Sequence, residues 1–142
     1  MSFKTSLVLI LFSLLLLTGC TQNISEKDVA MLNGYWEIEK VIMPNGDKKE
    51  YTVNETIDLF HIEKNTGWRK KVKPQFDGKY IDAGDPQDVI VSIKDDKAFI
   101  ICKTPFTQWN DEILEISKDK LVLKNEQEME YHYKKAVPFS IK

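Results

Sequence analysis

Turn-forming residues divide the chain after residue 33 into short apolar segments, spaced at about 8 to 12 residues. The clearest case is the run Val89–Ile93, which turns at Lys94–Lys97 and returns as Ala98–Cys102. An earlier segment ends at Asn45-Gly46, a pair that tolerates the positive φ angles of a tight hairpin turn. This spacing leaves little room for long helices and predicts an all-β fold.

The expected strands are rich in β-branched and aromatic residues and end at Gly, Pro, Asn, Asp or Ser. The last of them alternates Met129, Tyr131 and Tyr133 with charged or polar neighbours, as a strand between core and water does. The segments are Gly34–Met43, Glu55–Glu63, Trp68–Lys73, Gln75–Ile81, Val89–Ile93, Ala98–Cys102, Gln108–Ile116, Leu121–Leu123 and Met129–Lys134.

Eight or so antiparallel strands joined mainly by short turns have to bury one face of their sheet. Closing the sheet on itself also removes exposed edges. We therefore predict one domain over residues 33–142, an up-and-down β-barrel of about eight strands. An open sandwich is the alternative, because the sequence does not show whether the first and last strands pair. A short helix over Glu26–Leu32, opened by Ser25, would cap one end of the barrel.

Residues 1–19 have the form of a signal peptide, with Lys4 before an apolar run from Leu7 to Leu17. That run is shorter than the about 20 residues of a membrane-spanning helix. It ends in Leu17-Thr18-Gly19-Cys20, which resembles the lipobox of bacterial lipoproteins. The resemblance implies cleavage before Cys20 and attachment of lipid, including acyl chains such as palmitate, to that residue.

The same resemblance implies a protein of the cell envelope, held to a bacterial membrane by the lipid on Cys20. The outer membrane is the preferred location, and whether the domain faces the periplasm or the cell surface stays open. Residues 20–32 would then form a lipidated tether, polar from Thr21 to Asp28, followed by the short cap.

A second resemblance concerns the barrel itself. Gly34-Tyr35-Trp36 opens the first strand with a Gly-x-Trp that is similar to the opening of lipocalins, and closer to the small lipocalin-like lipoproteins of bacterial envelopes. The segments Trp109–Ile116, Leu121–Leu123 and Tyr131–Tyr133 look like that bacterial group too. The resemblance implies a barrel with Gly34 and Trp36 at its floor. Lipocalins commonly lay an arginine of the last strand across this tryptophan, and here Lys134 or Lys135 would have to replace it.

Residues that carry catalytic or metal chemistry form no recognisable pattern. His61 and His132 lie on different strands without metal-ligand spacing, and the chain has neither a nucleophile elbow nor a Gly-rich phosphate loop. We therefore expect no enzymatic activity, no metal and no cofactor. A net charge of −2 gives no reason to expect nucleic-acid binding. Cys102 follows two isoleucines and is expected to be buried.

The one basic block of the chain is Trp68–Lys73. Its alternation places Arg69, Lys71 and Lys73 on one face of a strand, which we interpret as solvated outer surface. Contact of this block with anionic lipid headgroups is the alternative.

The aromatic residues carry the remaining functional signal. An eight-stranded barrel is just wide enough to hold one small ligand or to be filled by its own side chains. We expect Trp68, Trp109, Tyr131 and Tyr133 to contact a small apolar or amphipathic ligand, which makes the protein a non-enzymatic binder. The alternative is a filled barrel whose loops contact a protein partner in the envelope.

Overall fold

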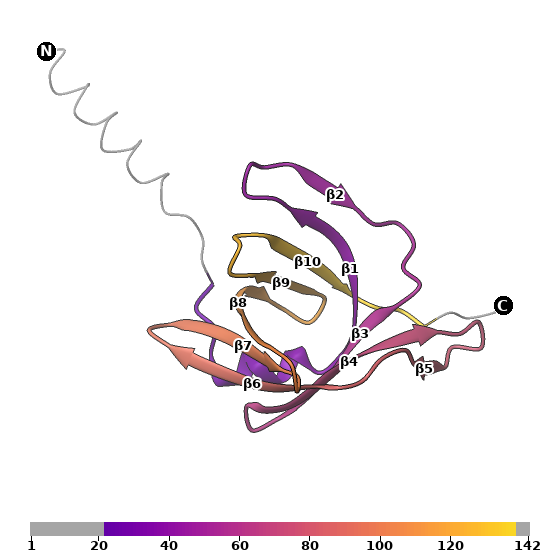
Figure 1. Ribbon diagram of the computed structural model, residues 1–142, viewed down its shortest axis with the longest axis horizontal. Coiled ribbons are helices and arrows are strands. Elements are labelled where there is room, and N and C mark those ends of the chain that lie inside the picture. The colour runs from indigo at the N-terminus through magenta and orange to yellow at the C-terminus, as the bar shows by residue number, and fades with distance from the viewer. Residues whose placement is uncertain (1–21, 139–142) are drawn as a thin grey trace, which may run out of the picture.

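Ten strands and one short helical segment make up residues 22–138, which are the residues that the computed structural model describes (Figure 1). Helix α2 (Glu26–Val29) continues into the 3₁₀ turn η2 (Ala30–Leu32) and leads into the first strand. The strands are β1 (Gly34–Ile42), β2 (Lys48–Glu50), β3 (Ile57–Glu63), β4 (Thr66–Pro74), β5 (Tyr80–Asp82), β6 (Gln87–Lys94), β7 (Lys97–Lys103), β8 (Gln108–Ile116), β9 (Lys120–Lys124) and β10 (Glu130–Lys135).

Eight of these strands form a closed antiparallel barrel. Their order is β1, β3, β4, β6, β7, β8, β9 and β10, and β10 pairs again with β1 from Trp36↔Lys135 to Ile42↔Glu130. Figure 1 shows β10 lying beside β1, with β2 and β5 at the periphery. The predicted up-and-down barrel is therefore confirmed, and the open sandwich is wrong.

Two local expectations differ from the structure. The sequence predicts a strand over Gln75–Ile81, but a turn closed by a hydrogen bond from the Gln75 N–H to the Lys79 carbonyl (2.8 Å) precedes β5. Gly78 has a φ of 83° there, which favours glycine. Strand β2 is not expected from the sequence, because its three residues are all charged and exposed and carry no apolar pattern.

The barrel interior changes character along its axis. Near α2 it is apolar, and the core cluster there includes Leu32, Trp36, Ile116 and Leu121, each at most 2% exposed. Bulges in β1 and β8 shift the register by one residue, so that Ile116 points inward although it follows inward-facing Ile113 by three positions. Towards the opposite end the inward positions become polar and aromatic. The apolar half closes the barrel, and the polar half leaves it open.

Trp36 fills the floor of the closed end. Its side chain is 0% exposed, and its Nε1–H donates to the carbonyl of Leu32 at 2.7 Å. The Nζ of Lys135 lies 4.2 Å from the Trp36 ring centroid and donates to the carbonyl of Asn33 at 2.6 Å. Gly34 has a φ of 114°, and a Cβ there would lie 2.9 Å from that Nζ. Lys135 thus takes the place across the tryptophan that a lipocalin gives to arginine.

The segment before β1 is docked onto the barrel. The side chain of Gln22 pairs with the backbone of Ile116, donating at 3.0 Å and accepting at 2.9 Å, and Ile24 is 4% exposed. Ser25 donates its backbone N–H and its hydroxyl to Asp28 at the start of α2. The polar tether expected up to Asp28 is therefore packed from Gln22 onward, while Cys20 lies outside the described residues. Within residues 22–138, no helix has the length and hydropathy needed to cross a membrane.

Candidate functional site

A pocket of about 350 Å³ opens at the end of the barrel that lies away from α2. Strands β3, β4, β6, β8, β9 and β10 all contribute to it, and one aliphatic side chain, that of Leu123, is among the described residues that line it. The full lining is Asp58, Arg69, Lys70, Lys71, Gln87, Trp109, Asn110, Asp111, Leu123, Asn125, Glu126, Gln127, Tyr131 and Tyr133.

Arg69 forms the base of this pocket. It lies at an inward position of β4, is 9% exposed, and its guanidinium carbon stands 4.9 Å from the centroid of the Phe60 ring below it. Its Nη2 donates to Asp58 Oδ1 at 3.3 Å, and its Nη1 lies 3.9 Å from Asp111 Oδ2. The two carboxylates come from β3 and β8, so one arginine joins three strands across the barrel.

Asp58 is fully engaged. It is 3% exposed, and its second oxygen accepts from Lys71 Nζ at 2.9 Å. Burial by itself would lower the pKa of Arg69, but the adjacent Asp58 carboxylate raises it, and the net pKa lies above the ordinary value. Arg69 therefore remains charged at every physiological pH, and Asp58 neutralises it.

Asp111 is held less firmly. Burial raises the pKa of its carboxyl above the usual range, Arg69 lowers it in part, and Glu126 raises it further. Burial also raises the pKa of the Tyr133 hydroxyl and of the Cys102 thiol, which lies 3.8 Å from Arg69 Nη1. Cys102 is 0% exposed, as its apolar neighbours predict. The thiol is neutral and enclosed, which gives it no nucleophilic character.

Aromatic rings form the walls above this base. Trp109 lies on β8, and Tyr131 and Tyr133 lie at successive inward positions of β10. Tyr133 is 7% exposed, whereas Tyr131 reaches the rim, where its hydroxyl oxygen accepts from Asn125 Nδ2 at 3.3 Å. The pocket thus combines flat apolar walls with a charged base.

Three of the four residues expected to contact a ligand come together in this pocket: Trp109, Tyr131 and Tyr133. Trp68 does not. It precedes inward-facing Arg69 on β4, so its ring lies on the outer face, stacked on His61 at 5.4 Å between centroids and covered by Lys70. A strand alternates its side chains, and the arginine occupies the inward position.

The sequence-based interpretation of the basic block as a solvated outer surface is wrong for Arg69, whereas the Lys71 side chain is half-exposed. Arg69 is buried inside the barrel, and Lys71 turns to Asp58 at the pocket. The interpretation fails because Asp58, the partner that makes an inward arginine tolerable, belongs to a different strand. Lys73 is exposed.

The histidines do not contribute to the pocket. His61 is exposed beside Trp68, and His132 lies on the opposite face of β10 from Tyr131 and Tyr133. In the part of the chain that the structure describes, no group of three or more His, Cys, Asp or Glu side chains could hold a metal ion.

Comparison with known proteins gives structural similarities at low sequence identity. The chain is similar to a lipocalin-like protein from Bacteroides uniformis, with 16% identity and a TM-score of 0.48, covering 75% of this chain and 99% of the other. It is also similar to an uncharacterized protein from Bacteroides eggerthii, with 14% identity and a TM-score of 0.48, covering 74% and 99%. No protein-family model and no curated protein sequence matches the chain.

Proposed function

We propose that the protein is a non-enzymatic binder that holds one small amphipathic molecule in the pocket at the open end of its barrel. The observation that carries this proposal is the pocket of about 350 Å³ with Trp109 and Tyr131 on its walls and the buried Arg69 at its base. Its volume lies at the lower end of the range of small-molecule sites, about 300–1,000 Å³. A compact ligand with a polar head suits this space better than a long acyl chain, because the base is charged.

A binding role accounts for the polar groups better than catalysis does. Both oxygens of Asp58 are occupied by cations, and the Cys102 thiol is enclosed with a raised pKa. Among the pocket residues that the structure describes, no hydroxyl or thiol hydrogen-bonds to a neighbouring histidine that could activate it. We therefore propose that the protein carries or senses a ligand.

Loss of the Trp109 ring should empty the pocket. We expect the wild-type protein purified from its own host to carry a bound small molecule in native mass spectrometry. Trp109→Ala removes one wall and should lower the affinity for the carried molecule about tenfold, since aromatic stacking contributes about 0.5–1.5 kcal/mol beyond the area that the ring buries, and about 1.4 kcal/mol is tenfold. Trp68→Ala is the matched control, because its ring lies outside the pocket, and it should carry as much ligand as the wild type. Equal loss in both variants would refute the assigned site.

We also propose that lipid on Cys20 anchors the protein to a bacterial envelope membrane. Gln22 is fixed to β8 at the closed end of the barrel, and it lies two positions after Cys20 in the sequence, a reach of about 7 Å when extended. With so short a connection, the closed end would lie next to the membrane. The open end would face away from it, accessible to a ligand in the aqueous phase.

The anchor is tested by labelling cells with a fatty-acid analogue. We expect the wild-type protein to be labelled and Cys20→Ala to remain unlabelled, because the thiol is the acceptor of the lipid. Cys102→Ala removes the other cysteine of the chain and should be labelled like the wild type. Labelling of Cys20→Ala at the wild-type level would rule out this anchor.

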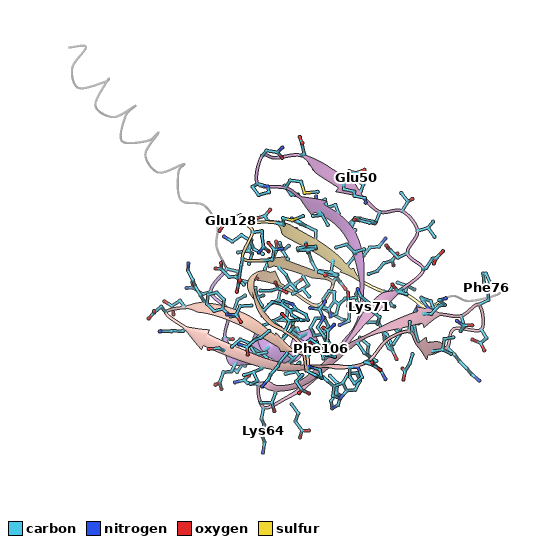
Figure 2. All side chains as sticks on the ribbon, in the orientation of Figure 1. Glu50, Lys64, Lys71, Phe76, Phe106 and Glu128 are labelled. Atoms are coloured by element: carbon cyan, nitrogen blue, oxygen red, sulfur yellow. The ribbon has the colours of Figure 1, made fainter. Side chains whose placement is uncertain are left out.

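One observation favours a protein partner as a second function. Phe106 is 95% exposed on the β7–β8 connection, and Phe76 is 79% exposed at the end of the β4–β5 hairpin (Figure 2). Exposed aromatic residues on loops are frequent contact points in protein interfaces. If Phe106→Ser abolished capture of an envelope protein while the host-purified barrel was empty, the interaction function would replace the binder.

A further inference from the structure

The cations around the pocket already have anionic partners. Arg69 is paired with Asp58 and Asp111, and Lys71 is paired with Asp58 at 2.9 Å. Lys70 lies against Asp82, which stands outside the pocket, at 2.8 Å. An anionic ligand would have to displace these carboxylates to gain a cation of its own. The positive charge of the pocket is therefore used within the protein.

Two hydrogen-bond acceptors of the pocket, in contrast, have no donor. Gln87 pairs with Arg69 across β4 and β6, and its Oε1 is buried with no hydrogen-bond partner in the described part of the chain. Asp111 is 8% exposed, and its carboxylate stands 3.9 Å from Arg69 Nη1, which is too long for a hydrogen bond. Of the two, only Gln87 Oε1 is fully buried and unpaired, and a buried acceptor without a donor is costly and rare outside sites that a ligand or water completes.

The charged side chains around the pocket also favour a positively charged ligand. The lining holds three carboxylates, those of Asp58, Asp111 and Glu126, and three cations, those of Arg69, Lys70 and Lys71, of which Lys70 is paired with Asp82 outside the lining. Glu126 is exposed at the rim and forms no ion pair with any residue from 22 to 138. The rings of Trp109 and Tyr131 add faces that attract a positive charge. With Lys70 paired outside the lining, two cations remain there for three carboxylates.

From this placement of acceptors and charge, which deepens the proposed function and rests on it, we propose that the ligand carries a protonated primary or secondary amine. Its N–H groups donate to the carboxylate of Asp111 and to Oε1 of Gln87, and its apolar or aromatic body lies against Trp109 and Tyr131. An amine with N–H groups fits better than a quaternary ammonium, because both acceptors need a donor. The ligand class is a small organic cation with a flat or apolar body.

Three probes of nearly equal size test the class without any mutation. Phenethylamine, phenylethanol and phenylacetate present a cation, a neutral hydroxyl and an anion on the same aromatic body. In calorimetric titrations of the wild-type protein, we expect phenethylamine to bind at least about tenfold more tightly than phenylethanol, because each added charged hydrogen bond exceeds a neutral one. Phenylacetate should bind most weakly. Tighter binding of phenylacetate, or equal binding of the amine and the alcohol, would overturn the inference.

Two variants test whether Asp111 is the residue that binds the amine. Asp111→Asn should lower the affinity for phenethylamine at least about tenfold and leave that for phenylethanol within about twofold. Glu115→Gln is the control, since it removes an exposed carboxylate of the same strand that pairs with Lys120 on the outer face. Because burial raises the pKa of Asp111, its ionised form does not stabilise the fold at neutral pH, and Asp111→Asn should melt no lower than the wild type.

Failure of this inference can be separated from failure of the binding function. If phenethylamine is not preferred but the host-purified protein carries another small molecule that Trp109→Ala loses, the pocket is a binding site and the amine assignment is wrong. If the protein purified from its host is empty and binds none of the three probes, both the inference and the proposed function fail.

Discussion

Replacing Arg69 with Met is expected to lower the free energy of unfolding by about 3–5 kcal/mol, which is the usual cost of removing one partner of a buried ion pair. The methionine fills a similar volume over Phe60 but leaves Asp58 and Asp111 facing each other in the barrel without their shared cation. Lys71 would still neutralise Asp58, whereas Asp111 would have no cation within contact distance among the described residues. Urea unfolding followed by far-ultraviolet circular dichroism measures the change.

The loss should also depend on pH. Burial raises the pKa of Asp111 above its unfolded value, and removal of Arg69 would raise that pKa further. A raised carboxyl pKa contributes stability below the unfolded pKa that is lost as the pH rises through the folded one. The variant should therefore be closer to wild type in mild acid than at neutral pH. The control is Lys70→Met, one residue along β4, whose partner Asp82 is exposed, and it should cost less than about 1 kcal/mol. Equal costs for the two variants would show that Arg69 is not a buried partner.

Trp36→Ala is expected to cost about 3–5 kcal/mol as a truncation of a fully buried aromatic residue. It removes the ring that closes the barrel floor, the hydrogen bond to the Leu32 carbonyl and the surface on which Lys135 lies. Burial lowers the pKa of Lys135, so an ammonium left over an empty floor would add to the cost.

Thermal denaturation checks this expectation against Trp68→Ala, the same substitution on the outer face. The control should shift the melting temperature by a few degrees at most, because the Trp68 ring contacts His61 and Lys70 on the barrel surface. If Trp36→Ala melted within about two degrees of the wild type, Trp36 would not be the floor of the barrel.

The fold could be predicted from the sequence because its signals are local. The β6–β7 and β8–β9 turns carry their own turn residues, and β10 separates inward from outward residues in a strict alternation. The closure of the barrel has no local signal, since the pairing of β1 with β10 joins residues about a hundred positions apart, and it could be expected only from the need to bury sheet edges. Short β2 has no local signal either, because charged residues pair there through their backbones alone.

The pocket could be predicted only in part. Trp109 and Tyr131 could be assigned to it because each is an aromatic residue at an inward position of its own strand, and the alternation within a single strand is enough to indicate this. The charged base could not be predicted, because it is assembled from three strands. Within any one of these strands, a charged residue is most simply interpreted as facing solvent.

A signal for this base is nevertheless present in the sequence. Asp58 occupies the same face of its strand as Phe60 and Ile62, and Asp111 stands between Trp109 and Ile113 at inward positions. Two acidic residues at core positions require a buried cation, and the chain contains a single arginine. The structure does not bring Trp68 into the pocket, because Arg69 occupies the inward position next to it on β4.

A crystal structure of the protein isolated from its own host, without added ligand, tests the central claim most directly. The account predicts a barrel closed between β1 and β10, with electron density for one compact molecule between Trp109 and Tyr131 above Arg69. It further predicts that a nitrogen of this molecule lies within hydrogen-bond distance of Asp111. A barrel whose own side chains fill this space, or a molecule bound elsewhere while the pocket holds only water, would contradict it.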